Sequence, residues 1–231
     1  MIVSVHQPHY LPWTGYFDKI DSADVFVLLD TVQFEKNGWQ NRNRIKCPSG
    51  WMWLTIPVEH RLGASIAETA ISRRQAWERK HRNALASCYG RAAFYARYAE
   101  FFDAVYGREW DSLCAVNGEM LAFFLRDMGI GTRVVRASEL GPMPEEPNER
   151  LAAIVSALGG DTYLAGSGCA GYFAHGPFKR EGIRVVFQDY RPVEYPQLHG
   201  AFEPGLSIVD LLLNRGDAAL EIIRKGRRTE L

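Results

Sequence analysis

The sequence predicts an α/β protein built on a doubly wound, mostly parallel sheet with an inserted helical region. Two short apolar runs, residues 2–5 and 23–30, lie near the start of the chain with one helical segment between them. The same alternation of strand and helix patterns returns after residue 132, and a long helical block separates the two parts. We therefore expect one α/β domain over residues 1–231, with a helical insertion at about residues 72–128.

Two prolines mark the end of the first strand and the start of the first helix. Pro8 and Pro12 follow the run 2–5 closely and exclude a central strand there, so a tight loop is expected. Proline is favoured in the first turn of a helix, and Pro12 therefore predicts a helix at about residues 13–20.

The second apolar run, residues 23–30, is continuous and closes with Asp30, which is typical of a strand buried on both faces. The segment 31–49 that follows is rich in amides and arginines and is expected to be a loop. Residues 51–58 are then expected to form a strand near an edge, because Pro57 cannot donate a backbone hydrogen bond.

The helical block is expected to begin after Ser72, a suitable N-cap, and to be interrupted at Gly90, Gly107 and Gly129. Five aromatic residues recur in it with helical spacing and predict one core face: Phe94, Tyr98, Phe101, Phe102 and Tyr106. After the block we expect strands at 132–137, 162–165 and 183–188, and helices at 148–158, 207–215 and 217–225. The basic tail 224–228 is expected to be a solvated end.

Composition narrows the class of protein. The 231 residues include 27 Lys and Arg against 27 Asp and Glu, so the net charge does not steer the chain toward nucleic acid or anionic lipid. The four cysteines are far apart and form no C-x-x-C pair, which is unfavourable for a zinc site or a disulfide scaffold. The sequence shows no signal-peptide pattern and no apolar run of about 18 residues, so we expect a cytoplasmic protein without a membrane span.

The site is expected where the carboxyl ends of parallel strands lead into loops. Four such loops, residues 6–16, 30–46, 166–171 and 189–190, hold an unusual share of the histidines, amides and arginines. We expect the loops to converge on one cavity.

The first loop supplies the expected catalytic groups. His6 or His9 could take a proton near neutral pH or neutralise a phosphate, and the helix start after them favours an anion. The neighbouring side chains Gln7, Tyr10, Trp13 and Tyr16 are expected to bind substrate, with Tyr16 also assisting catalysis. The alternative is that His9 caps the turn and the aromatic residues fill the core. No third ligand accompanies the two histidines, so no metal is expected.

The second loop supplies the expected binding groups. Its cations suit phosphate or carboxylate, and its amides suit the hydroxyls of a sugar or a nucleotide base. The candidates are Asp30, Gln33, Asn37, Gln40, Asn41, Arg42, Asn43, Arg44 and Lys46. With Trp39 and Trp51 nearby, stacking on single-stranded RNA is a second interpretation, and a solvated loop is a third.

Two further features are weaker. Residues 166–171 match G-x-G-x-x-G, but Gly176-Pro177 would break the helix of a dinucleotide fold, so Gly166, Ser167 and Gly168 are expected to cradle a ligand other than NAD. Lys80 and His81 share a helix face with Trp77 and could bind phosphate or carry protons, or form an ordinary surface pair.

These residues resemble a known family. Residues 6–20, HQPHYLPWTGYFDKI, are similar to the opening signature of the WbqC-like proteins, as are the Trp77/Lys80/His81 helix, residues 163–168, Phe202-Glu203-Pro204 and residues 207–212. The resemblance spans almost the whole chain. It implies an enzyme of O-antigen, amino-sugar or natural-product biosynthesis that acylates or aminoacylates an amine.

A looser resemblance is to the nucleotidylyltransferase superfamily, including pantothenate-synthetase-like ligases, whose Rossmann-like (HUP-like) fold it implies. Trp13-Thr14-Gly15-Tyr16 falls where that superfamily has H-x-G-H, and Gln33-Phe34 where it has Q-F. Both histidines of the superfamily motif are replaced, which weakens the case for ATP chemistry.

The first hypothesis is a transferase or ligase that forms an amide on an amino-sugar nucleotide or similar small amine. The acyl or aminoacyl donor would be coenzyme A, a carrier protein or tRNA, or an acid activated with ATP. The alternatives are an ATP-dependent nucleotidyltransferase and a non-catalytic module that binds a sugar or RNA.

Overall fold

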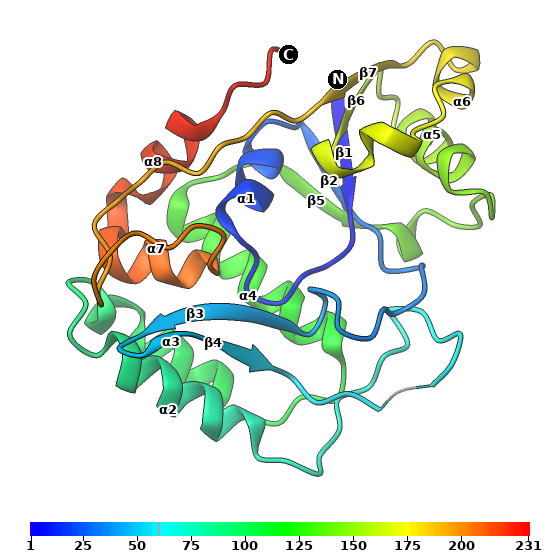
Figure 1. Cartoon of the computed structure of the whole chain (residues 1–231). Coiled ribbons are helices and arrows are strands. Elements are labelled where there is room, and N and C mark those ends of the chain that lie inside the picture. Colours follow the sequence, from blue (N-terminus) through cyan, green and yellow to red (C-terminus); the bar gives the residue numbers. More distant parts are fainter. Residues whose placement is uncertain (60) are drawn as a thin grey trace.

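A computed structural model describes residues 1–59 and 61–231 and contains a five-stranded parallel sheet (Figure 1). Its strands are β1 (Ile2–His6), β2 (Val25–Leu28), β5 (Arg133–Arg136), β6 (Thr162–Ala165) and β7 (Arg184–Phe187), in the spatial order β5-β2-β1-β6-β7. Every neighbouring pair is parallel. The α/β prediction is therefore confirmed, and the order is that of a doubly wound sheet.

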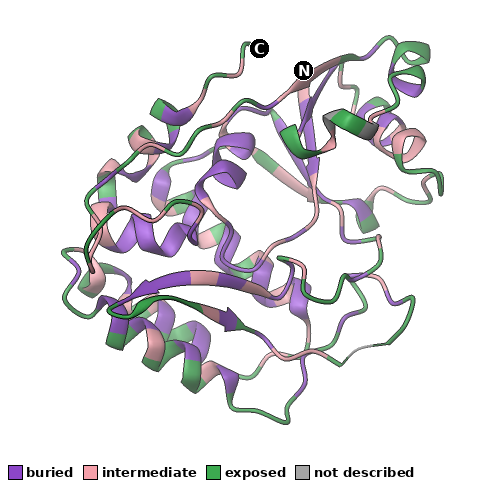
Figure 2. Cartoon of the chain, in the orientation of Figure 1, coloured by how far each residue is buried: buried purple, intermediate pink, exposed green. Residues whose placement is uncertain are grey.

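The three central strands β1, β2 and β6 bury both faces, whereas the edge strands β5 and β7 are only partly buried. In β2, Val25 and Val27 belong to one hydrophobic cluster, whereas Phe26 and Leu28 belong to the other. Helices α5 (Pro147–Ala157) and α6 (Gly176–Arg180) supply the first cluster, on the right of Figure 1. Helices α1 (Thr14–Asp21), α7 (Ile208–Arg215) and α8 (Ala219–Gly226) contribute to the second. The first strands and α1 are correspondingly almost entirely buried (Figure 2).

Between β2 and β5 the chain leaves the sheet for about a hundred residues. This segment contains the hairpin β3 (Arg42–Cys47) and β4 (Gly50–Thr55), then helices α2 (Trp77–Tyr89), α3 (Tyr95–Tyr106) and α4 (Leu113–Met128). Short 3-10 helices complete the fold at Ala137–Glu139, Ser167–Tyr172 and Gly216–Ala218. The division of the chain into one domain stays a prediction.

Two sequence expectations about this segment were wrong. The polar segment 31–49 is not all loop, because residues 42–47 pair antiparallel with β4. The first helix of the block begins at Trp77, with Ala76 and not Ser72 at its N-cap. The backbone N–H of Ser72 instead bonds the carbonyl of Pro57, which holds the chain in an extended connection.

The basic tail is also not free in solvent. Arg227 Nε lies 2.7 Å from Asp18 Oδ1, and Arg224 Nη2 lies 2.8 Å from Asp21 Oδ1. Asp18 is fully buried on α1. Ion pairs therefore connect the end of α8 to α1, and the expectation of a solvated tail was wrong for Arg224 and Arg227.

Across the residues described, no helix combines the length and the apolar character that crossing a membrane requires.

Candidate functional site

The candidate site lies where the strand order reverses, between β1 and β6. Connections from these two neighbouring strands leave in opposite directions, and this opens a crevice at their carboxyl ends. In Figure 1 the carboxyl end of β1 points toward the β3–β4 hairpin. The loops after β1 and β6 therefore face the inserted segment.

Two hollows occupy this crevice. One has a volume of about 460 Å³ and the other about 670 Å³, and His6, Gln7 and Gly168 line both. We call the two together the cleft. Lys19, Arg150, Gly166 and Cys169 are among the further residues of the smaller hollow. His9, Trp13, Trp39, Arg44 and Gly205 complete the larger one.

Three rings cluster at the cleft, and two of them, His6 and His9, line it. The centroids of His6 and His9 are 4.6 Å apart, and that of Tyr16 lies 4.9 Å from His6 and 5.3 Å from His9. The carbonyl of Gln7 accepts the Tyr16 hydroxyl at 3.0 Å and also lies 3.1 Å from His6 Nδ1. A carbonyl oxygen only accepts, so Nδ1 of His6 carries the proton and Nε2 keeps its lone pair.

Both imidazoles are neutral at pH 7. Burial and the nearby charges of His9 and Lys19 hold the pKa of His6 well below its usual range. Burial, assisted by Lys19, lowers the pKa of His9 to about 3. Burial also raises the pKa of Tyr16 above its ordinary value, so this hydroxyl keeps its proton.

Lys19 brings a positive charge to the wall of the smaller hollow. Its side chain is only 2% exposed, and Nζ donates a hydrogen bond of 2.9 Å to the carbonyl of Val5. Burial lowers the pKa of Lys19 to about 8, so the ammonium form still prevails at pH 7. The thiol of Cys169 donates to the carbonyl of Gly166 at 3.0 Å, and burial raises its pKa despite Lys19.

The cleft is short of negative charge. Neither hollow is lined by an Asp or Glu among the described residues. Within that same part of the chain, Lys19, Arg44 and Arg150 have no carboxylate within 4 Å. Cations that lack carboxylate partners favour binding of an anion.

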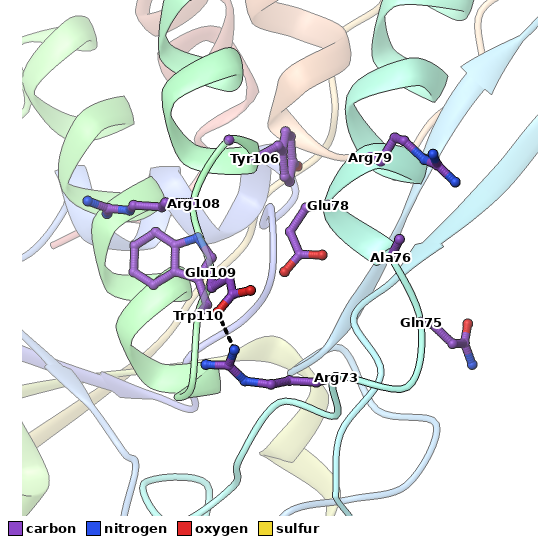
Figure 3. A pocket seen from close by; sticks show the side chains of 10 residues that line it. Arg73, Gln75, Ala76, Glu78, Arg79, Tyr106, Arg108, Glu109 and Trp110 are labelled. Carbon is purple, nitrogen blue, oxygen red and sulfur yellow. Dashed lines mark hydrogen bonds and ion pairs between the residues drawn. The ribbon is translucent and has the colours of Figure 1, made fainter.

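A second pocket shows the opposite arrangement. It has a volume of about 360 Å³ beside α2 and the end of α3, and Arg73, Arg79 and Arg108 line it (Figure 3). Arg73 reaches Glu109 and lies 2.6 Å from Asp111, and Arg108 pairs with Glu119. Most of its positive charge is therefore compensated, and we assign it no ligand.

Hydrogen bonds bring the first two predicted loops together. Gln40 Nε2 donates to Gln7 Oε1 at 2.8 Å, and the N–H of Tyr10 donates to the carbonyl of Trp39 at 3.1 Å. Asn43 Nδ2 donates to the carbonyl of Leu11 at 2.6 Å. The imidazole loop and the arginine and amide segment thus open onto one cleft.

Some of the residues singled out in the sequence lie at the cleft, and others hold the structure. Lining the cleft are His6, Gln7, His9, Trp13, Arg44, Gly166 and Gly168, with Tyr16 in the ring cluster. Gln33 lines an adjoining hollow that shares Gln7 with the cleft. Ser167 is exposed at the start of the 3-10 helix after β6, and Arg42 donates to Asn37 on the hairpin side.

The remaining candidates are bound elsewhere. Asp30 accepts from Ser138 at 2.7 Å, Asn41 donates to the carbonyl of Ile56, and Lys46 donates to Gln197 at 3.1 Å. These contacts, like those of Gln40 and Asn43, occupy the side chains in holding loops together.

The pair on α2 is separate from the cleft. His81 is buried, with Nδ1 2.8 Å from the hydroxyl of Tyr10, and Tyr10 also bonds Tyr106 at 2.6 Å. Burial lowers the pKa of His81 to about 4. Lys80 is exposed and donates to Gln75. Tyr10, Lys80 and His81 therefore do not line either hollow of the cleft.

Sequence reasoning missed Lys19 and Arg150. Lys19 follows Tyr16 by three residues on the same helix and therefore shares its face, a spacing that could have indicated it. Arg150 comes from α5, and only the strand order shows that this helix flanks the cleft.

The described residues contain no group of three or more His, Cys, Asp or Glu side chains that could hold a metal ion.

A family model for the WbqC-like protein family matches residues 7–222. The chain belongs to this family. It is also 35% identical over 230 residues to a protein of Mycobacterium tuberculosis named "Uncharacterized protein Rv1507c", with 98% of this chain and 99% of that protein covered. No solved structure is significantly similar. The matched residues include the cleft loops after Gln7, the hairpin and the inserted helices α2, α3 and α4.

Proposed function

We propose that this WbqC-like protein is an enzyme that transfers an acyl or aminoacyl group to the amine of a small, negatively charged acceptor. The observation that supports it is the composition of the cleft. Two neutral imidazoles line the hollows together with Lys19, Arg44 and Arg150, and no carboxylate lines the two hollows where the chain is described.

The two hollows give each substrate a place. Both are lined by His6, so a donor in one and an acceptor in the other would meet at this imidazole. Lys19 and Arg150 would bind an anionic group in the smaller hollow, and Arg44 would bind one in the larger. Holding two reactants in register in this way supplies much of the acceleration in bimolecular transfers.

His6 is the residue that we assign as general base. Its Nδ1 is committed to the carbonyl of Gln7, and no described residue bonds its Nε2. Nε2 would take the proton as the amine nitrogen attacks the acyl carbon. A new C–N bond forms, the C–S or C–O bond of a thioester or ester donor breaks, and the departing thiol or hydroxyl receives the proton from His6.

Substrate binding would tune this base. Burial is the largest cause of the low pKa of His6 in the free protein, and repulsion by Lys19 adds to it. An anion beside Lys19 would compensate that repulsion and raise the pKa of His6 by the part that is due to Lys19. His6 would therefore be a stronger base when the acceptor is bound than in the free protein.

The test is amide formation followed by mass spectrometry. The full-length protein is incubated with acyl-coenzyme A thioesters or aminoacyl-tRNA and a panel of amino-sugar phosphates and amino-sugar nucleotides. We expect an acylated product, with kcat lowered about 10²–10⁴-fold by His6→Asn.

The matched control is His175→Asn, because His175 is exposed near α6 and lines neither hollow. Full activity of His6→Asn would contradict the assignment of His6 as the general base. Exchange of labelled pyrophosphate into ATP, without any acylated product, would instead assign nucleotidyl transfer.

A further inference from the structure

The β3–β4 hairpin carries an ordered set of cations and indoles on one face. Strand side chains alternate, so Arg42 and Arg44 share a face of β3 while Asn43 and Ile45 point to the interior. On β4 the same face carries Trp51 and Trp53. The sequences R-N-R-I and W-M-W-L encode this arrangement.

The side chains of that face contact one another in a continuous series. The guanidinium carbon of Arg42 lies 4.4 Å from the Trp53 ring centroid, and that of Arg44 lies 5.0 Å from Trp51. The Trp53 centroid is 5.9 Å from that of Trp51 and 5.5 Å from that of Trp39. We call Trp39, Trp51, Trp53, Arg42 and Arg44 the indole platform.

The indole platform is open to ligand. Trp39 is 42% exposed and Trp51 is 45% exposed, although large aromatic side chains usually bury most of their surface. The Nε atoms of Arg42 and Arg44 are buried and make no hydrogen bond. Neither arginine has a carboxylate partner within 4 Å in the part of the chain that the structure describes.

The indole platform also continues into the cleft. Trp39 and Arg44 line the larger hollow together with His6 and His9. The hydrogen bond from the Tyr10 N–H to the Trp39 carbonyl fixes this edge against the imidazole loop. A flat ring on Trp39 would thus lie next to a cation and within the same hollow as the assigned base.

We propose that the indole platform binds the nucleotide portion of a nucleoside diphosphate-linked substrate. The nucleobase stacks on Trp39, whose ring contacts that of Trp53 at an angle of 47°. The diphosphate is held by Arg44 at the entrance to the cleft. Exposed indoles beside arginines that lack carboxylate partners favour a ligand that joins an aromatic ring to phosphate. This inference rests on the proposed function and names the carrier of its acceptor.

The experiment compares three probes on the full-length protein by isothermal titration calorimetry: UDP, ADP and inorganic pyrophosphate. We expect at least one nucleoside diphosphate to bind about tenfold or more tightly than pyrophosphate. Trp39→Ala should remove that advantage and leave pyrophosphate binding unchanged, and Trp39→Phe should restore most of it. Arg44→Met should weaken all three probes.

Trp110→Ala is the matched control, because Trp110 also stacks with an arginine, Arg108 at 3.9 Å, but lines the pocket beside α2. It should bind all three probes as the unaltered protein does. Equal affinity for pyrophosphate and both nucleoside diphosphates would overturn the proposal, as would unchanged UDP and ADP binding by Trp39→Ala.

Two further outcomes separate the proposals. Affinity that rises with the length of a single-stranded oligoribonucleotide would identify an RNA surface and overturn the nucleotide assignment. Pyrophosphate binding could depend on Lys19 and Arg44 without any increase in affinity when a nucleobase is present. That result would overturn nucleotide binding by the indole platform but support the anion site of the proposed function. Absence of binding by all three probes would count against both.

Discussion

At the scale of single residues, the neutral imidazoles of the cleft make folding depend on pH. The unfolded chain binds a proton at a histidine below pH 6.5, whereas folded His9 binds one only near pH 3. The unfolded state therefore holds more protons between these values. The contribution of neutral His9 to the free energy of unfolding is fully present above about pH 6.5 and is lost as the pH decreases toward 3.

His9→Asn should reduce this dependence. Asparagine takes up no proton in the unfolded state in this range. The slope of unfolding free energy against pH should therefore be smaller by up to about 1.4 kcal/mol per pH unit between pH 6 and pH 4. Urea unfolding at several pH values measures the slope. His175→Asn is the control, and an identical slope in His9→Asn and the unaltered protein would contradict the low pKa of His9.

Lys19 should make anion binding weaker as the pH rises, because its side chain loses its positive charge. With a pKa of about 8, its ammonium is present below that pH and is lost as the pH rises through it. Pyrophosphate affinity should therefore fall between pH 7 and pH 9. In Lys19→Met the affinity should be weaker throughout and should lack the part of the decrease that is due to Lys19. Calorimetry on both proteins cancels the ligand's own ionisation, and parallel profiles would contradict a role for Lys19.

At the scale of elements, apolar strands were predictable and the polar strand was not. Residues 2–5, 23–30 and 162–165 stand out because the strands within them are buried on both faces. Residues 183–188 stand out by their apolar run, although β7 is partly exposed at the edge of the sheet. In β3 the buried face includes Asn43, whose polarity is offset by hydrogen bonds to loop carbonyls. Alternation was present in R-N-R-I-K-C, but composition concealed it, since arginine and asparagine are uncommon in strands.

The same hydrogen bonds make Asn43 important for stability. Asn43→Ala would leave the buried carbonyl of Leu11 without its donor and should reduce the free energy of unfolding by about 1–3 kcal/mol. Asn43→Asp should not restore stability, because a carboxylate cannot donate. Asn83→Ala, on the exposed face of α2, is the control for urea unfolding. A loss no greater than that of the control would show that the hairpin does not depend on this bond.

At the scale of the whole molecule, the site depends on strand order. The sequence shows which loops follow strands, and hence that His6, Gln7, Gly166 and Gly168 belong near one edge of the sheet. It does not show that β1 and β6 are neighbours, because 155 residues lie between His6 and Thr162. Arg150 could not be assigned for this reason. The roles of Lys80 and His81 depend on tertiary packing in the same way, since the sequence does not reveal that Tyr10 and Tyr106 enclose His81.

An ion pair also connects the end of α8 to α1. The Arg227 side chain is 24% exposed and the Asp18 side chain 0% exposed, so removing the cation leaves a buried carboxylate without its ionic partner. Arg227→Met should lower the free energy of unfolding by about 3 kcal/mol, and Asp18→Asn in the same chain should recover part of the loss. A double-mutant cycle by urea unfolding measures the coupling, with the exposed Arg228→Met as control. Additive effects would show that the pair contributes nothing.

The central position of β1 has a consequence for biosynthesis. Among the five strands of the sheet β1 is translated before the others, but its second neighbour, β6, ends at residue 165. On the ribosome the nascent chain therefore carries an unpaired edge of its innermost strand until the whole insertion has emerged. Such an edge is a template for aggregation, so a chain interrupted before residue 165 would leave β1 open to pairing with another chain.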